Sequence, residues 1–211
     1  MIIFQRMVTF QGPAQEVVPW AMDITETVNG ATDLEVSLWQ GRFGGPVGTL
    51  AWSTLADSLT ALEAAFDALG SDAAYLDLET KAADWVTTPG EDSLLRMVHT
   101  TGGEYTRPAV GSYAEVTAAT PSEGHFAEAG AWAVEIADMH ARLTHSSVLV
   151  CTSGYGGFGE MRWLGLYDSA AAVDAGAEAI AKDEDYIAAL DGGGGLFQEG
   201  SATRTLARRI A

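Results

Sequence analysis

Few residues of this sequence have the types and spacing that catalysis or metal binding requires. The candidate catalytic residues are Glu160, Arg162 and His99. Glu160 and Arg162 alternate along a predicted strand, so both side chains point to one face of it. On that face they could act on a substrate by proton transfer and charge stabilisation, or form a solvent-exposed ion pair. His99 ends another predicted strand, where it is either a general base or a histidine whose hydrogen bonds are satisfied locally.

The other histidines and the single cysteine indicate no metal site and no nucleophilic dyad. His125 and His140 are separated by about 22 Å along one predicted helix, so they cannot share a metal ion. Cys151 and His145 lie about 20 Å apart on one predicted strand, which is too far for a thiolate–imidazole pair. We therefore expect no cofactor. Haem, which needs one axial histidine such as His125 or His140, is the alternative.

Four aromatic residues are candidates for contact with a substrate. Trp52 and Trp163 occupy matching places on two predicted strands, where they either pack in the core or form the wall of an aromatic pocket. Tyr155 and Phe158 lie in the glycine-rich stretch TSGYGGFG, which is typical of a hairpin loop and could cover a pocket mouth. The glycine-rich stretches of the chain lack the spacing of a phosphate-binding loop.

Arg6 and Arg96 are candidate substrate-binding residues of a different kind. Both are basic residues within predicted strands of a strongly acidic chain. An arginine in a sheet either pairs with a carboxylate or an anionic substrate, or lies at the surface.

Composition limits the classes of partner. The 211 residues carry a formal net charge of -18, which repels the phosphates of nucleic acids. Hydrophobic residues make up 47% of the chain, but no apolar stretch approaches the roughly 20 residues of a membrane span. One cysteine excludes an intrachain disulfide and is typical of a reducing compartment. We expect a cytoplasmic protein with a small-molecule ligand; the sequence leaves open whether it forms a homo-oligomer.

The elements that must position these residues come from an internal repeat. The segments 48–75 and 159–186 are identical at 10 of 28 positions, including the glycine that opens each and the tryptophan four residues later. Upstream, EVVPWAMDI matches EAGAWAVEI at an offset larger by one residue. We therefore predict two repeats, 1–100 and 112–211, joined by a Gly-, Thr- and Pro-containing linker at 101–111.

Each repeat contains alternating apolar segments typical of strands and amphipathic segments typical of helices. In the first repeat we expect strands at 2–11, 34–40, 47–53 and 92–100, and helices at 12–29, 57–70 and 71–85. In the second we expect strands at 113–119, 146–151, 159–166 and 203–210, and helices at 123–142 and 169–181. Asp and Ser before the later helices are predicted to cap them.

The order β-α-β-β-α-β predicts an α+β, ferredoxin-like fold in each repeat. Such a sheet has helices on one face and leaves the other face bare. Two repeats in one chain can cover each other's bare faces, so we predict that they pack sheet to sheet as an α+β barrel.

The repeated tryptophan and Asp-Ser turn, the alanine-rich helix and the D-x-x-Y motif resemble the dimeric α+β barrel superfamily, in particular its antibiotic-biosynthesis-monooxygenase-like and NIPSNAP-like domains. The resemblance implies a tandem fusion that pairs within one chain. It also implies a small-molecule enzyme, such as a cofactor-independent monooxygenase, cyclase or isomerase acting on an aromatic or polyketide-like substrate. A non-catalytic binding or assembly protein is the alternative, with haem binding a third.

Overall fold

The computed structural model describes residues 1–86, 89–103 and 105–211, and its elements follow one order twice. The first run contains β1 (Ile2–Thr9), α1 (Ala14–Ala31), β2 (Ser37–Phe43), β3 (Thr49–Ala56), α2 (Leu59–Ser71), α3 (Ala73–Ala82) and β4 (Glu91–Thr100). The second run contains β5 (Tyr113–Ala119), α4 (Phe126–Thr144), β6 (Ser147–Tyr155), β7 (Met161–Tyr167), α5 (Ala170–Lys182), α6 (Glu184–Gly192) and β8 (Thr203–Arg209).

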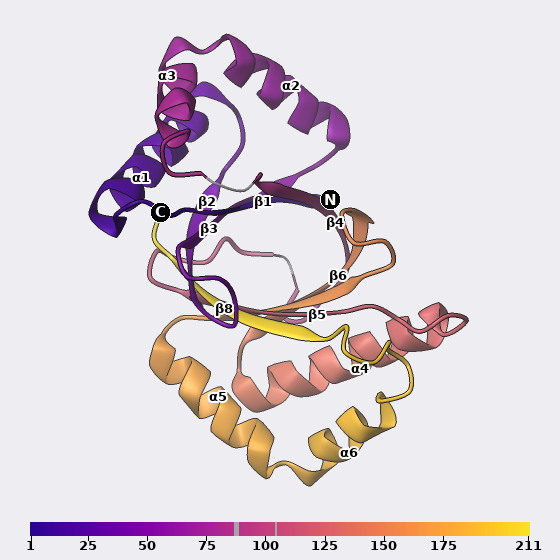
Figure 1. Cartoon of the computed structure of the whole chain (residues 1–211). Helices are drawn as coiled ribbons and strands as arrows, with labels where there is room; N and C mark the ends of the chain where they lie inside the picture. Colours follow the sequence, from indigo (N-terminus) through magenta and orange to yellow (C-terminus); the bar gives the residue numbers. More distant parts are fainter. Residues whose placement is uncertain (87–88, 104) are drawn as a thin grey trace.

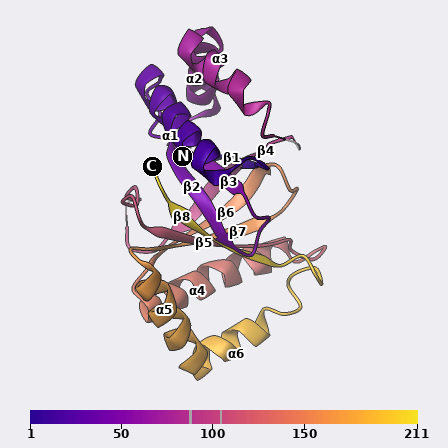
Figure 2. The same cartoon turned by 60° about the vertical axis from the view of Figure 1, so that its left-hand side comes forward.

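The eight strands form one closed antiparallel barrel in the order β1-β3-β2-β8-β5-β7-β6-β4. The two runs join where β2 pairs with β8 and where β4 pairs with β6. Helices α1–α3 lie on one side of the barrel and α4–α6 on the opposite side (Figure 1), and the same layering is visible from a second direction (Figure 2). The predicted α+β fold, with two sheets facing each other as a barrel, is confirmed.

Local sequence explains where the later helices begin. The hydroxyl oxygen of Ser58 accepts from the amide of Ala61, and Ser169 accepts in the same way from Ala172. The predicted capping of these helices is confirmed, and the N-cap is the serine of each Asp-Ser pair. Aspartates cap α3 and α6 similarly, as the carboxylate of Asp72 does for the amide of Tyr75. Each cap satisfies an otherwise unpaired helical N–H and stabilises by about 1 kcal/mol.

The outer face of each sheet packs against its helices, and large aromatic side chains fill both interfaces. One cluster gathers Phe10 and Trp20 beside Trp52 under α1 and α3. The other gathers Trp132 and Trp163 under α4 and α6. These edge-to-face contacts fix each helical layer on its sheet, so the inner face of the barrel is left to other side chains.

The two ends of the barrel differ. At one, called here the hairpin end, the hairpins at 44–48 and 156–160 join β2 to β3 and β6 to β7. At the other, called the linker end, the segment at 101–112 passes from β4 to β5. Backbone bonds tie this segment down at both sides, from Thr101 to Val148 and between Gly111 and Arg209. Both sides of the linker are therefore anchored to strands at this end of the barrel, while the division into repeats at 1–100 and 112–211 stays a prediction.

Within the described part of the chain, no helix has both the length and the apolar character that crossing a membrane would need.

Candidate functional site

A cavity of about 1420 Å³ occupies the barrel interior and continues to a mouth at the hairpin end. Its wall is mainly apolar because the inward residues of the strands are mostly aliphatic. The apolar wall residues include Ile3, Met7, Trp39, Leu55, Leu95, Val116, Leu149, Leu164 and Leu166. At the mouth, Phe43 and Val47 are exposed beside the cavity. A concave, apolar site of this size with a few polar groups is what binding of a hydrophobic small molecule requires.

Trp39 is the largest aromatic side chain of the wall. It is buried on β2 and packs with Ala51 and Ala114 inside the barrel. Its indole Nε1 donates to Ser53 Oγ at 2.9 Å, which fixes the ring plane. A fixed indole beside small residues offers a flat surface for stacking of a ring.

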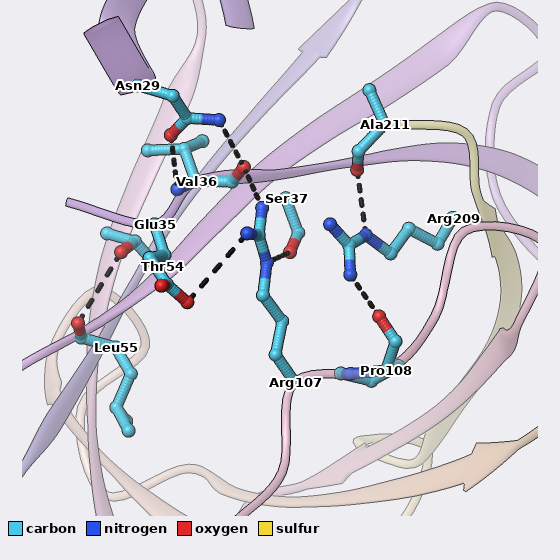
Figure 3. Close-up of polar contacts among 10 residues, drawn as sticks. All are labelled: Asn29, Glu35, Val36, Ser37, Thr54, Leu55, Arg107, Pro108, Arg209 and Ala211. Atoms are coloured by element: carbon cyan, nitrogen blue, oxygen red, sulfur yellow. Dashed lines mark hydrogen bonds and ion pairs between the residues drawn. The ribbon is translucent and has the colours of Figure 1, made fainter. Parts of the chain in front are cut away.

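The linker end of the cavity is lined by Tyr105 and Arg107. Tyr105 packs against the aliphatic residues of the inner wall, including Leu95 and Leu149. The Arg107 guanidinium donates from Nε to Ser37 Oγ at 3.0 Å and from Nη2 to the carbonyl of Val36 at 2.6 Å. Figure 3 shows this guanidinium held against the start of β2.

Arg209, from the last strand, lies at the same end as Arg107 (Figure 3). It donates to the carbonyl oxygens of Ala211 and Pro108 and so connects the linker to β8. Burial lowers the pKa of Arg209, and the nearby charge of Arg107 lowers it further. Burial also raises the pKa of Tyr105 despite the opposing effect of the two arginines, so its hydroxyl stays protonated at neutral pH and can donate.

A polar chain crosses the barrel near the hairpin end. Arg162 Nε binds Glu160 Oε1 at 2.5 Å, and Arg162 Nη1 donates to Gln5 Oε1 at 2.8 Å and to Ser93 Oγ at 3.3 Å. The two charged side chains are 14% and 22% exposed. Of these four residues, Gln5 lines the cavity. With Oε1 occupied by Arg162, its amide nitrogen is the group that can donate to a ligand.

The structure places His99 away from this cavity. Its Nε2 binds Asp138 Oδ1 of α4 at 2.8 Å, on the outer side of the sheet. The predicted general-base role at the cavity therefore does not fit its position, and the alternative of a locally satisfied strand-end histidine does. A bulge in the pairing of β4 with β6 lies near Met97 and His99, and the position of His99 at a strand end does not predict the outward direction of its side chain.

Trp52 and Trp163 also lie outside the cavity, between sheet and helices. The indole Nε1 of Trp52 donates to Thr25 Oγ1 of α1, and that of Trp163 donates to the carbonyl of Ala133 in α4. Core packing, one of the two predicted roles, is therefore the role that fits them, and the pocket-wall role is corrected. Their inward neighbours in sequence, such as Ala51 beside Trp52, face the cavity instead.

The remaining predicted binding residues lie on the outside. Arg6 makes two 2.7 Å bonds to Asp92, and the hydrogen bond to Asp92 raises the pKa of Arg6. Arg96 is exposed on β4. Tyr155 and Phe158 are exposed on the hairpin that joins β6 to β7, and neither lines the cavity. Arg6 thus follows the alternative of pairing with a carboxylate, and Arg96 follows the surface alternative.

The histidines and the cysteine do not form a metal centre. Among the residues that the structure describes, no group of three or more His, Cys, Asp or Glu side chains is placed to hold a metal ion. His140 lies outside the barrel, where its Nε2 is 2.8 Å from Tyr167 Oη and its Nδ1 is 3.3 Å from Tyr186 Oη. Cys151 is fully buried, and burial raises the pKa of its thiol to about 12.

The cavity residues missed by sequence reasoning include Gln5, Trp39, Tyr105 and Arg107. The linker sequence EYTRPAVG holds a tyrosine and an arginine, which is unusual for a segment whose only task is connection in a chain with 11 basic residues. That signal was available. The inward direction of Trp39 was not, because Trp39 shares a face of the strand with Glu35 and Ser37, and that is the more polar face of LEVSLWQ.

Comparisons of the structure agree with this architecture. A candidate monooxygenase from Fusobacterium nucleatum is similar over 100% of this chain and 92% of its own, with a TM-score of 0.73 and 8% identity. An anthrone oxidase-like protein is similar over 100% and 91%, with a TM-score of 0.70 and 16% identity. A candidate monooxygenase from Lactobacillus acidophilus is similar over 99% and 93%, with a TM-score of 0.65 and 12% identity. No family of known sequences matches the chain, and no curated protein is similar to it in sequence.

These likenesses show the fold. The chain forms a closed α+β barrel in which one polypeptide supplies all eight strands. At such low identities a shared fold does not transfer an activity, so function has to be argued from the cavity.

Proposed function

We propose that the barrel cavity binds a hydrophobic aromatic or polyketide-like molecule and that the chain is a small-molecule enzyme, namely a cofactor-independent monooxygenase, cyclase or isomerase. The observation that carries this proposal is the cavity itself, about 1420 Å³ in volume with predominantly apolar walls. Ligand sites commonly measure about 300–1000 Å³, so a molecule of several fused rings is accommodated. Trp39 supplies a stacking surface within it.

Oxygenation is the reaction that the structural neighbours favour, since one is described as anthrone oxidase-like and two as candidate monooxygenases. Oxidation of anthrone illustrates it. The methylene carbon loses a proton to solvent, its carbanion transfers electrons to dioxygen and forms a C–O bond, and loss of water leaves a carbonyl. One anthrone and one dioxygen give one anthraquinone and one water. The substrate supplies the electrons, so the protein's tasks are to bind the ring and to stabilise the anion.

In this proposal Arg162 and Glu160 are positioning residues. They hold the side-chain oxygen of Gln5, and the amide nitrogen of Gln5 is left to donate to substrate oxygen. His99 takes no part, because its imidazole is bound to Asp138 outside the barrel.

Binding without turnover is the second candidate function. The strand residues of the cavity wall between its two ends are aliphatic, aromatic, amide or hydroxyl side chains, and none of those described is a titratable base. Haem binding is less favoured, since the four histidines of the chain are absent from the cavity lining.

The test is oxygen uptake with anthrone as the probe, followed together with the absorbance of anthraquinone. We expect the purified protein to accelerate the reaction above the rate in buffer. Ala51→Phe places a phenyl ring in the cavity and should lower the acceleration about tenfold or more, because ring and substrate compete for one space. Ala64→Phe, on the exposed side of α2, is the matched control and should behave as the wild type.

Binding of anthrone without oxygen uptake would favour the non-catalytic function. Neither binding nor uptake, or equal activity in Ala51→Phe and the wild type, would contradict the assignment of the cavity as the reaction site.

A further inference from the structure

We propose that the linker end of the cavity is an anion-binding subsite, so that the ligand carries a carboxylate or another ionised oxygen that Arg107 and Tyr105 bind. This rests on the proposed function, because it concerns one end of the same ligand cavity. The ring system then lies in the apolar middle of the barrel and its charged group points to the linker, away from the mouth.

Arg107 provides the charge. Its hydrogen bonds to Ser37 and to the carbonyl of Val36 hold the guanidinium plane in place through Nε and Nη2 (Figure 3). Nη1 is 3.8 Å from Glu35 Oε2, beyond hydrogen-bond distance, and the Glu35 side chain is 78% exposed. A carboxylate arriving from the cavity can therefore take the N–H groups of Nη1 while Glu35 turns into solvent. Two neutral partners orient the cation, and its charged partner is the exposed Glu35.

Tyr105 provides a neutral donor beside that charge. Its ring packs on Leu95 and Leu149 inside the barrel, so the hydroxyl sits at the border between apolar wall and arginines. Burial raises the pKa of Tyr105, which keeps the proton that it donates. A guanidinium and a phenol on one anion form charge-assisted hydrogen bonds, which are about twice as strong as neutral ones.

Arg209 makes the subsite more positive and holds it together. It is buried, lies close enough to Arg107 for their charges to repel, and donates to Pro108 in the linker that carries Tyr105 and Arg107. Two like charges kept together at one end of an apolar cavity repel each other in the free protein. An anion bound there relieves that repulsion, which favours binding of an acid over a neutral molecule of the same shape.

The experiment compares two probes of nearly the same shape, anthraquinone-2-carboxylate and anthraquinone-2-carboxamide, by isothermal titration calorimetry near pH 7.5. We expect the carboxylate to bind the wild type about tenfold more tightly than the amide, which is the size of one charge-assisted contact. Arg107→Gln should remove that preference, because it weakens the binding of the carboxylate and leaves the binding of the amide unchanged. Arg42→Gln is the matched control, because Arg42 also lines the cavity but at the hairpin end, and it should keep the preference.

Tyr105→Phe gives a second measurement that does not depend on Arg107→Gln folding well, since it removes one hydroxyl and leaves the ring. This substitution should weaken the binding of the carboxylate more than the binding of the amide. Equal affinity of both probes for the wild type, equal effects of the Arg42 and Arg107 substitutions, or no effect of Tyr105→Phe on either probe would overturn the subsite and leave the cavity proposal standing. If neither probe binds, the subsite and the proposed ligand site are both overturned.

Discussion

At the scale of single residues, Arg162 shows how a charged side chain is kept inside a mostly apolar barrel. Its guanidinium has three partners, Glu160 in the hairpin before β7, Gln5 on β1 and Ser93 on β4, which together compensate for the loss of water. Thr49 and Ala51, at the matching positions of the other run, are small and uncharged, so the first run has no counterpart of this ion pair.

Removing one member of the ion pair between Arg162 and Glu160 should destabilise the protein more than removing both. We expect Arg162→Met to lower the free energy of unfolding by about 3 kcal/mol, because Glu160 is left largely buried without its partner. The double variant Arg162→Met, Glu160→Leu should recover most of the loss. Urea unfolding followed by circular dichroism measures the wild type, Arg162→Met, Glu160→Leu and the double variant, and additivity of the two single losses would contradict this coupling.

His140 leads to a pH prediction. Burial lowers its pKa, with Glu115 opposing and Arg204 adding to the shift, and Tyr167 and Tyr186 bind the ring. The unfolded chain therefore takes up a proton near pH 6.5, before the folded protein does. The free energy of unfolding should fall as the pH drops below about 6.5 towards the folded pKa, and should be independent of His140 above that range.

The measurement is the difference in unfolding free energy between the wild type and His140→Gln from pH 5 to 8. An amide can bind both tyrosine hydroxyls but does not titrate, so the difference should be constant above about pH 7.5 and should shift against the wild type below pH 6.5. A difference that is constant over the whole range would show that His140 does not titrate in this way.

At the scale of elements, the strands and helices were predictable because their signals are local. Apolar alternation marks the strands, and Ser58 and Ser169 mark the starts of their helices. The cavity was harder to predict. Which face of β3 and β7 turns inward depends on the closure of the whole barrel. The sequence therefore shows which residues share a face with Trp52 and Trp163, but not whether that face points into the barrel or towards the helices.

The two glycines that open the repeated segments look equivalent in sequence but differ in space. Gly48 has φ +89°, and an added Cβ would collide with the carbonyl oxygen of Phe10, whose amide in turn donates to Gly48. Gly159 has φ +74° and open space around it. Both need the left-handed conformation that glycine adopts without strain, but only Gly48 also permits a close backbone approach.

We therefore expect Gly159→Ala to lower the free energy of unfolding by about 1 kcal/mol. Gly48→Ala should lower it by at least about 2 kcal/mol more, because strain and a backbone collision add at Gly48. Thermal unfolding of the two variants beside the wild type is the measurement, with Gly159→Ala as the matched control. Equal losses in melting temperature would mean that the backbone at Phe10 moves away without cost.

At the scale of the whole molecule, the two runs of elements join through two pairs of strands, called seams here, and the two seams are alike. β2 pairs with β8 at one seam and β4 pairs with β6 at the other. In the order of elements, β8 is the counterpart of β4 and β6 is the counterpart of β2. Both seams therefore join a second strand to a fourth strand, as two copies of one half would do around a two-fold axis.

This arrangement predicts the behaviour of the first half alone. Residues 1–100 keep their own helical layer and its aromatic cluster, but they expose β2 and β4 as unpaired edges and the inner face of the sheet as bare apolar surface. A second copy can supply both edges, β4 to β2 and β2 to β4, and cover that face, so we expect this fragment to form a homodimer with strand content in its circular dichroism spectrum. Light scattering after size-exclusion chromatography should give twice the mass of the fragment. A folded monomer would contradict the view that each half requires a partner at its open face. It would show that the apolar surface that now forms the cavity wall can stay uncovered without unfolding the half.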